Sequence, residues 1–382
     1  DRVSFAMQMP DDSLRLSTYI DKAGLTEGSV DLGLARYSAA RFLLSGSSLG
    51  YDGSYGDPTP GFDPSHIALS NVNIKIDSLL YGGRDICAQI KEFSANDRSG
   101  LVLSSLTGNI RSDSTTIQVP GLLLKTPYSD IRLLATVPWS TFDEKPNGSL
   151  HTLLTASVGK EDLFIFAGPL PEDLKQAYPK ESISLTAGVE GNLAALRLRQ
   201  LKGKLPGVFD LNATGEIKAV TDSIHRNGKL QLRAETGNLD FILGMLPASE
   251  RSRYNLPTMK LTGEAALQNQ EYKADLLLTQ DQGKVKLTAR YNPVRESYEA
   301  DLRVDSLKPT NFLPKDSLYQ LTATIRAEGK GYDPFLAATW AKLDGKISNI
   351  EYGTYAVSDV KLDGSLEKNL LKFDLLSHYP LA

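Results

Sequence analysis

The sequence predicts an all-β fold: an elongated, curled antiparallel β-sheet that forms an open trough, β-taco-like, with a few short helices. Three observations predict it. Apolar and polar residues alternate along most of the chain, clusters of Gly, Asn and Asp separate these runs, and helical spacing is confined to short stretches. Alternation with turn signals at short intervals is typical of antiparallel sheets.

The alternation is clearest in the second half of the chain. Over 209–217 the odd positions are apolar or small and the even positions polar, and 284–291 repeats the pattern. Period-2 alternation places the apolar side chains on one face of a strand and the polar ones on the other. We therefore expect an antiparallel sheet with one apolar and one hydrated face.

Short phrases recur on these predicted strands. Lys-Leu-Asp-Gly occurs at Lys342–Gly345 and again at Lys361–Gly364, and Leu-Thr-Gly occurs at Leu106–Gly108 and Leu261–Gly263. A small residue in an apolar row allows a strand to bend or bulge. The recurrence favours a degenerate repeat of meander units; one compact β-sandwich is the alternative.

The remaining stretches suggest helices and boundaries. Helices are predicted within Pro169–Ala177, Asn238–Arg251 and Lys308–Lys315, as caps on the apolar face. We expect a leading β segment over 1–60, with a joint rich in Gly and Pro at 46–64, and a repetitive sheet groove over 61–382. Sub-boundaries are expected near 168–180 and 238–256.

Composition excludes several classes of function. The net charge is −4 and no segment concentrates Lys and Arg with aromatic residues, so nucleic acid is not an expected partner. The single cysteine, Cys87, excludes an internal disulfide framework and a cysteine-built metal site. No apolar run approaches the ~18–20 residues of a membrane helix. Because the chain starts at Asp1, we expect a mature form or a piece of a longer protein, with any membrane anchor outside it.

No convincing catalytic site is found, and the chain is predicted not to be an enzyme. Gly46–Gly50 fits the G-x-S-x-G pattern of hydrolases, but the residues after Ser48 would not start the helix that this chemistry needs. The four histidines are far apart and lack metal-ligand spacing. No phosphate-binding loop, dinucleotide motif or calcium loop is present, so neither cofactor nor metal is predicted. A secreted β-rich hydrolase that uses Ser48 is kept as a distant alternative.

The segment from Phe62 to Val137 resembles a known family. Its carrying phrases are Ile74–Leu79, Ser99–Leu101 followed by Leu106–Gly108, and Lys125–Ile131, and the closing "KLDGSLEKNLLKFDL" has the same style. These phrases resemble the translocation and assembly module family, TamB, within the AsmA-like group, and most of all its long forms from Bacteroidetes. The likeness covers most of the chain but consists of strand patterns and not of catalytic motifs.

The resemblance implies a periplasmic protein of a Gram-negative bacterium that spans the space between the inner and outer membranes. It implies an N-terminal anchor in the inner membrane and a TamA-like, Omp85-family barrel in the outer membrane as partner. Members are thought to carry phospholipids in an apolar sheet groove, with an older proposed role in outer-membrane protein assembly. This chain would then be an internal segment, without the anchor and the C-terminal domain.

The residues agree with such a groove. An apolar face must be covered, and an acyl chain that covers it gains about 0.8 kcal/mol per buried CH₂. Roughly twenty strands spaced ~4.8 Å apart would form a trough on the order of 100 Å long. The alternative is a face filled by its own side chains. The predicted groove-lining residues are Phe209, Leu211, Ile217, Leu230, Leu232, Leu261, Leu276, Val285, Leu287, Leu302, Leu321 and Ile325.

Two further hypotheses remain open. The chain could act as a scaffold or chaperone whose strand edges pair with client β-strands during outer-membrane protein assembly. Separately, recurring Asp-Ser-Leu or Asp-Ser-Ile tripeptides are similar to acceptor sequences for periplasmic O-glycosylation in Bacteroidetes, although Asp-Ser is also ordinary turn chemistry. The serines concerned are Ser13, Ser78, Ser223, Ser306 and Ser317.

Overall fold

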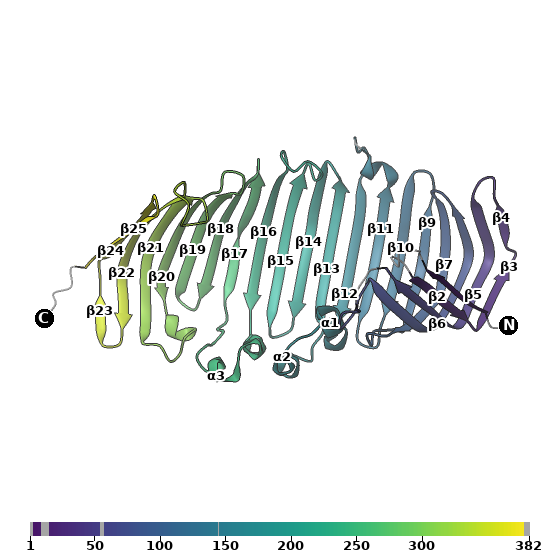
Figure 1. Ribbon diagram of the computed structural model, residues 1–382, viewed down its shortest axis with the longest axis horizontal. Coiled ribbons are helices and arrows are strands. Elements are labelled where there is room, and N and C mark those ends of the chain that lie inside the picture. Colours follow the sequence, from purple (N-terminus) through teal and green to yellow (C-terminus); the bar gives the residue numbers. More distant parts are fainter. Residues whose placement is uncertain (1–2, 9–14, 54–56, 144, 378–382) are drawn as a thin grey trace. The chain divides into compact units, whose positions relative to one another are not determined.

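The computed structural model describes residues 3–8, 15–53, 57–143 and 145–377. Its contacts divide the chain into unit 1, Asp1–Asn192, and unit 2, Leu193–Ala382. In Figure 1 the strands of unit 1 run from purple to teal and those of unit 2 from teal through green to yellow. The division falls between two strands, and the domain boundaries expected from the sequence stay predictions.

Unit 1 is an antiparallel sheet with short helices. The pairing runs β1–β2–β5–β6–β7–β9–β10–β11–β12–β13, with β3 and β4 also beside β5 and β8 beside β7. Its strands are β1 Val3–Gln8, β2 Arg15–Ile20, β3 Lys22–Thr26, β4 Ser29–Asp31, β5 Arg36–Asp52, β6 His66–Gly82, β7 Asp85–Asp97, β8 Val102–Leu103, β9 Ser105–Ser112, β10 Thr116–Lys125, β11 Asp130–Pro138, β12 Leu150–Val158 and β13 Ile183–Asn192. Its helices are η1 Trp139–Phe142, α1 Lys160–Ala167 and α2 Glu172–Ala177.

Unit 2 is a meander in which almost every strand pairs with the next one along the chain. The exception is the short β23, which lies beside β22 while β24 continues the sheet. Its strands are β14 Ala195–Leu205, β15 Phe209–Lys218, β16 Asn227–Thr236, β17 Lys260–Gln268, β18 Glu271–Gln280, β19 Gly283–Asn292, β20 Ser297–Leu307, β21 Leu318–Lys330, β22 Trp340–Tyr352, β23 Tyr355–Val357, β24 Val360–Glu367 and β25 Leu370–Leu376. Its helices are η2 Asp240–Met245, α3 Ala248–Arg251 and η3 Pro309–Asn311.

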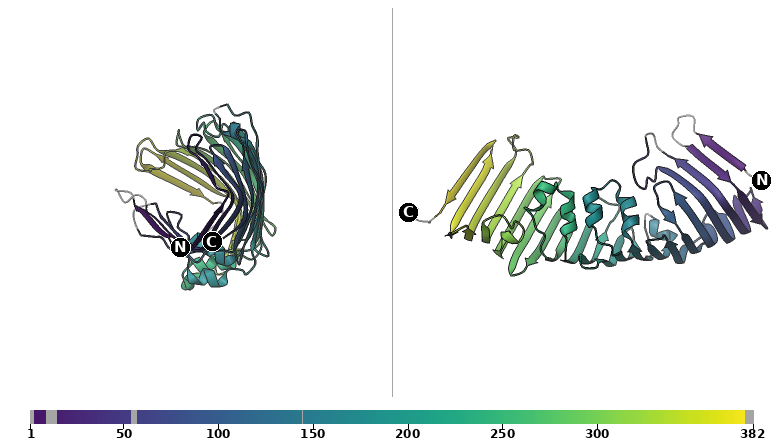
Figure 2. Two further views of the ribbon diagram at one scale, coloured as in Figure 1. Left: turned by 90° about the vertical axis from the view of Figure 1, so that its right-hand side faces the viewer. Right: turned by 90° about the horizontal axis from the view of Figure 1, so that it is seen from below.

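The prediction of an antiparallel all-β fold with a few short helices is confirmed. No pairing among the described residues joins the first strand of a unit to its last, so each sheet is open and not rolled up. The helices predicted at 169–177, 238–251 and 308–315 are present as short segments, whereas α1 was not foreseen. In unit 2, α3 lies at the ends of the strands (Figures 1 and 2).

The joint predicted at 46–64 is shorter in the structure. β5 continues through Asp52, and residues 57–65 connect it to β6. Gly46 adopts a φ of +59°, and the pairing of β5 with β6 changes register between Leu44 and Ser47. A bulge built around a residue with positive φ bends a strand without ending it, so the glycine that suggested a joint is a strand bulge.

The repeated Lys-Leu-Asp-Gly phrase has a structural explanation in unit 2. The two copies lie on β22 and β24 and pair with each other in antiparallel register, with Leu343 opposite Gly364 and Gly345 opposite Leu362. A Cβ added to Gly345 would lie 3.1 Å from the Leu362 Cβ. Each glycine therefore leaves room for the leucine of the other copy.

Candidate apolar binding face

The strand register of unit 2 gathers its apolar residues on one face, which we call the apolar face. Because the pairings from β15 to β20 contain no register shift, side chains on neighbouring strands align in rows. The central leucine row contains Ala213, Leu232, Gly263, Leu276, Leu287, Leu302, Ile325, Gly345 and Leu362. Such cross-strand neighbours are the contacts that stabilise a sheet.

Two more rows lie beside the leucine row, toward one end of the strands. The alanine row is formed by Ala265, Ala274, Ala289, Ala300 and Ala327. The tyrosine row lies beyond it and contains Tyr272, Tyr291 and Tyr298. On the other side of the leucine row, Leu261, Leu278, Val285, Val304 and Ala323 form a further apolar row.

All the groove-lining residues predicted from the sequence lie on the apolar face. Cross-strand pairs join Leu276, Leu287, Leu302 and Ile325 in one row, and Leu321 pairs with Leu307 after the bulge that follows Val304. The remaining members lie on the same side of β15 to β19, namely Phe209, Leu211, Ile217, Leu230, Leu232, Leu261 and Val285.

Most of these side chains are only partly buried. Among the described residues of unit 2, the buried apolar residues are few: Leu205, Val208, Ala213, Val304, Ala323 and Val360. Leu230 is exposed, and Leu276, Leu287 and Leu302 are half-buried. The face therefore retains solvent-accessible apolar surface, which an apolar ligand could cover.

The two ends of the strands in unit 2 differ. At one end, loops that contain η2, α3 and η3 are joined by hydrogen bonds. The Asn255 amide N–H donates to the Phe312 carbonyl (2.8 Å), and Asn311 Nδ2 donates to Gln280 Oε1 (2.9 Å). Gln280 is buried. We call this the capped end.

At the opposite end, the tyrosine row is extended by Tyr332 from the loop after β21. Ring centroids lie 6.1 Å apart for Tyr272 and Tyr291, 6.3 Å for Tyr291 and Tyr332, and 6.5 Å for Tyr298 and Tyr332. The Tyr332 and Tyr291 hydroxyl oxygens are 2.8 Å apart. This hydrogen bond, followed by desolvation, raises the pKa of Tyr332 to about 12, so its phenol stays protonated near neutral pH.

The opposite face of unit 2 is polar. Its cross-strand ion pairs include Lys229–Glu264 (2.8 Å), Arg326–Glu299 (2.9 Å) and Lys286–Asp275 (3.5 Å). Hydrogen bonds from Lys229 and Gln231 lower the pKa of Glu264 below its ordinary value. Such exposed pairs contribute little stability each, so their main effect is to keep this face hydrated.

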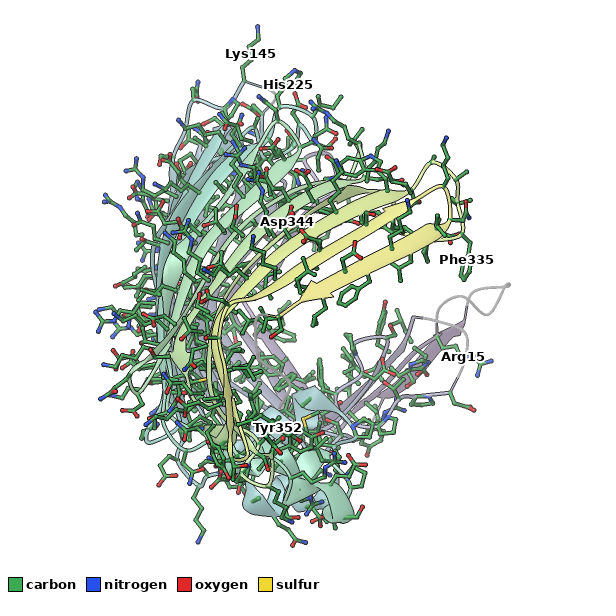
Figure 3. All side chains as sticks on the ribbon, turned by 90° about the vertical axis from the view of Figure 1, so that its left-hand side faces the viewer. Arg15, Lys145, His225, Phe335, Asp344 and Tyr352 are labelled. Carbon is green, nitrogen blue, oxygen red and sulfur yellow. The ribbon has the colours of Figure 1, made fainter. Side chains whose placement is uncertain are left out.

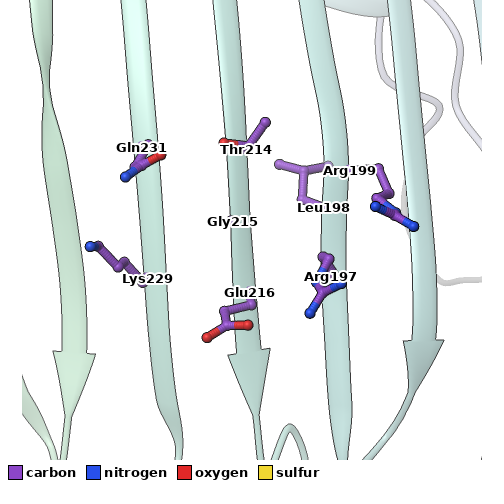
Figure 4. A pocket seen from close by; sticks show the side chains of 8 residues that line it. All are labelled: Arg197, Leu198, Arg199, Thr214, Gly215, Glu216, Lys229 and Gln231. Atoms are coloured by element: carbon purple, nitrogen blue, oxygen red, sulfur yellow. The ribbon is translucent and has the colours of Figure 1, made fainter.

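A shallow depression of about 320 Å³ lies at the bulge of β14. Figure 4 shows its lining side chains spread over neighbouring strands. They mix both charges, with Arg197, Arg199 and Lys229 near Glu216. The depression is open and its charged groups do not converge, so it is not a catalytic arrangement.

The Ser48 alternative lacks the required geometry. Ser48 lies within β5 opposite Tyr19, and its carbonyl accepts a hydrogen bond from the Thr18 hydroxyl (3.0 Å). A nucleophile elbow needs a sharp turn into a helix, whereas here the strand continues to Asp52. The hydrolase interpretation is therefore not supported.

Two of the described histidines, His66 and His225, pair with carboxylates three residues away. His66 Nδ1 lies 3.0 Å from Asp63 Oδ2 and His225 Nδ1 lies 2.7 Å from Asp222 Oδ2. Hydrogen bonds from Thr59, Ser65 and His66 hold the pKa of Asp63 well below its usual range. No group of three or more His, Cys, Asp or Glu residues able to hold a metal ion occurs in the part of the chain that the structure describes.

The Asp-Ser tripeptides mark bulges and turns. Ser78 (φ +55°) and Ser306 (φ +51°) adopt left-handed backbone conformations where β6 and β20 shift register. Ser223 is exposed in the turn between β15 and β16, and Ser317 directly precedes β21. Ser13 lies outside the described residues. The bulges give the motif a backbone role, and modification of these serines stays a prediction.

Two features were missed at the sequence level. The first is the joining of Tyr272, Tyr291 and Tyr298 in one cross-strand row that Tyr332 extends; the alternation had placed these three tyrosines on the apolar face as residues that could fill a closed core, but it did not align them. The second feature is in unit 1, where the buried Asp162 of α1 accepts hydrogen bonds from the hydroxyls of Thr126 and Ser129. These two residues lie in the turn between β10 and β11, so Asp162 anchors α1 to that turn.

None of the helices among the described residues has the length and apolar character needed to cross a bilayer. No family model, no curated protein and no solved structure matches the chain. The resemblance to the TamB family therefore stays a prediction.

Proposed function

We propose that the apolar face binds the acyl chains of phospholipids, and that the chain is a segment of a lipid-transfer conduit. The observation that supports this proposal most directly is the alignment of apolar side chains in continuous rows across the strands of unit 2. Much of the surface of these side chains is accessible to solvent. The rows need no catalytic group, so the proposed role is not enzymatic.

A row of leucines binds apolar ligands but does not distinguish one position along the row from the next. Covering it gains roughly 25 cal/mol per Å² of apolar surface removed from water. Neighbouring positions along a row are chemically alike, so an acyl chain that shifts by one strand exchanges one set of contacts for a similar set. Such a face favours long, unbranched apolar ligands and allows movement across the strands.

Unit 1 contributes a similar row. Cross-strand pairs connect Phe42, Ile76, Ile90, Gly108, Leu122, Leu133, Leu154 and Ala187 from β5 to β13. The same property in both units supports a role that is distributed along the chain. The cell-envelope setting, the anchor in the inner membrane and the Omp85-type barrel partner are proposed on the resemblance to the TamB family.

Photocrosslinking tests the proposal. A photoreactive residue is placed at Leu287 on the apolar face or at the adjacent Lys286 on the polar face, and the protein is incubated with vesicles that contain radiolabelled phospholipid. Label at 287 and not at 286 is expected. Absence of label at both sites, or equal label at both, would contradict the proposal.

A substitution gives the second measure. Leu287→Asp places a charge between Leu276 and Leu302 in the leucine row, which an acyl chain could cover only with a large desolvation cost. We expect much less phospholipid to co-purify with this variant. Lys286→Asp is the matched control, because it changes the charge of the neighbouring residue on the other face.

The scaffold alternative depends on a different feature. Every residue of β25 is exposed, and among the described residues β25 pairs only with β24. A strand with one free edge can accept another β-strand. A proline at Lys372 should abolish client binding if this role is correct, and should leave labelling at Leu287 unchanged.

A further inference from the structure

Three hairpin tips of unit 2 come together beside the tyrosine row. The Gly331 amide N–H donates to the Glu296 carbonyl (2.9 Å), which connects the loop after β21 to the β19–β20 turn. Asn369 Nδ2, in the β24–β25 turn, donates to the Phe335 carbonyl. The hydrogen bond between Tyr332 and Tyr291 fixes the same loop to the apolar face.

These tips expose large apolar side chains. Phe335 is 84% exposed, Val294 70% and Leu336 58%. Phe335 has the largest exposed fraction of any large apolar residue that the structure describes. Figure 3 shows it at the outer end of its loop, away from the strands.

The backbone of the tips is fixed by local hydrogen bonds. The Phe335 amide N–H donates to Asp333 Oδ1 (2.9 Å), the Thr339 amide to the Leu336 carbonyl (2.9 Å), and the Val294 amide to Asn292 Oδ1 (3.0 Å). Asn292 and Thr339 are buried. Since these bonds hold Phe335, Leu336 and Val294 outward, the exposure is a property of the folded loops.

At this end of unit 2, the chemical type of the side chains changes in order from the hairpin tips toward the sheet. Outermost are the aliphatic and phenyl side chains, next come the phenols of Tyr332, Tyr291 and Tyr298, and then the alanine and leucine rows. Tyrosine is favoured at a membrane–water interface because its ring is apolar and its hydroxyl is polar. Phenyl and aliphatic side chains beside it are the ones that enter the acyl region of a bilayer surface.

The charges at the tips are balanced. Arg295 is followed by Glu296 in the β19–β20 turn, Asp333 lies in the loop after β21, and Lys368 lies in the β24–β25 turn. A polybasic patch would bind anionic lipids mainly through its charge, whereas this surface carries no excess of either sign. A zwitterionic bilayer surface suits it.

We infer that the cluster of hairpin tips, with Val294, Phe335 and Leu336 at its apex and Tyr332 behind them, is a site of contact with a lipid bilayer. The three apical side chains insert among the acyl chains, and the tyrosine hydroxyls lie at the level of the headgroups. Lipid would then meet the apolar face at the tyrosine end and not at the capped end. Membrane contact at the tips and acyl binding on the face are separate properties.

Flotation with vesicles tests the inference. The full chain is mixed with phosphatidylcholine vesicles and centrifuged through a density gradient. The chain is expected to float, and Phe335→Ser with Leu336→Ser should reduce partitioning at least about tenfold, since two apolar side chains no longer enter the bilayer. Partitioning should change little between low and high salt, because no net charge is involved.

The matched control uses exposed aromatic residues from the opposite end of the same strands. Tyr352 is 56% exposed and Tyr355 is 63% exposed, and Tyr352 and Trp340 lie at opposite ends of β22 (Figure 3 shows Tyr352 and Phe335). Tyr352→Ser with Tyr355→Ser should float as well as the unchanged chain. An equal loss of flotation in both double variants would show nonspecific adsorption to the vesicles and would overturn the inference.

Two other outcomes would contradict bilayer contact at the hairpin tips. An unchanged chain that does not float contradicts bilayer contact. If that chain self-associates in solution and the Phe335→Ser, Leu336→Ser variant does not, the tips are a protein–protein surface and the inference is wrong. Photocrosslinking at Leu287 with detergent-dispersed phospholipid reports on the face alone, so failure at the tips and failure of acyl binding are distinguished.

Discussion

Units 1 and 2 share antiparallel pairing but differ in how regular it is. In unit 1, β5, β6 and β7 change register several times, at Gly46, Asn71 and Ser78 among other positions. In unit 2, the pairings from β15 to β20 are uninterrupted. Yet each unit has at least one apolar row that crosses most of its strands. Bulges therefore bend the strands, but the apolar side chains stay on the same face of the sheet.

The second difference concerns connections. Unit 1 packs the 57–65 connection on α1, where the Phe62 amide N–H donates to the Ile165 carbonyl (2.9 Å) and the Phe62 and Phe166 rings lie 5.2 Å apart. The buried carboxylate of Asp162 anchors that helix. Unit 2 has no such buried carboxylate among its described residues. Its stability should be spread over many similar cross-strand contacts, whereas unit 1 should depend on a few polar anchors.

The largest effect on stability is expected at Asp162, which anchors α1 in unit 1. Asp162→Ala leaves the hydroxyls of Ser129 and Thr126 without their acceptor, and should lower the free energy of unfolding of unit 1 by about 2–4 kcal/mol. The chain has two tryptophans, Trp139 in unit 1 and Trp340 in unit 2. Urea unfolding followed by Trp139 in a Trp340→Phe background should show the loss.

The control is Glu161→Ala, the exposed neighbour on the same helix, which should change the free energy of unfolding little. In the converse background, Trp139→Phe, Trp340 should report an unchanged unit 2. If both tryptophans report the same loss, the units unfold as one body and the contrast between local and distributed stability fails.

The next largest effect on stability is expected at a glycine where the backbones of two neighbouring strands of unit 2 approach closely. A Cβ at Gly263 would lie 2.2 Å from the Asp275 carbonyl oxygen of the neighbouring strand, whereas a Cβ at Gly203 would meet nothing nearer than 3.7 Å. Gly263→Ala should destabilise unit 2 by about 1–3 kcal/mol through overpacking. Gly203→Ala should leave stability unchanged or raise it slightly. Equal effects, measured by urea unfolding followed by Trp340, would mean that unit 2 relaxes around the added methyl group.

The tyrosine cluster predicts a pH dependence. Since the folded pKa of Tyr332 is about 12, against an ordinary value of 10.0, its contribution to stability is present below pH 10 and is lost as pH rises toward 12. Unit 2 should lose more stability between these pH values in the unchanged chain than in Tyr332→Phe. Urea unfolding at both pH values, followed by Trp340, measures the difference. If the two proteins lose the same amount of stability between these pH values, the hydrogen bond to Tyr291 is not formed in solution.

The smallest effect concerns like charges on the polar face. Asp363 lies directly opposite Asp344 on one side and Asp374 on the other. Asp363→Lys replaces two repulsions by two attractions and should stabilise unit 2 by about 0.2–1 kcal/mol for each pair. Asp374→Lys, with one such neighbour, should gain less. Both gains should shrink at high salt, and a gain that does not shrink would need another cause.

Much of the fold could be predicted from the sequence because period-2 alternation is a local signal. The odd positions from Phe209 to Ile217 face one way whatever the partner strands are, so all the predicted lining residues share a face. The register could not be predicted, because it depends on which strands pair. The opposition of Leu343 to Gly364 is visible only once β22 and β24 lie side by side.

The features that escaped prediction are of another kind. Asp162 is a charged residue in a short helix, and nothing local indicates that it is buried against Thr126 and Ser129. Tyr332 joins Tyr291 across two hairpins. Gly46 was interpreted as part of a joint because glycine is common in loops, but the same positive φ serves a bulge inside a strand. A pattern within a short window reveals neither the long-range contacts nor the positions at which strands bulge.

The pairing of the two Lys-Leu-Asp-Gly copies has a consequence for how such a molecule changes in evolution. A phrase that fits against its own copy can be duplicated without a new partner having to be found. A hairpin consists of two strands, so its insertion or deletion returns the chain to the same side and direction and leaves the neighbouring register intact. The number of strands can then change in steps of two while the chemistry of each row is kept, which makes length the property that varies most easily.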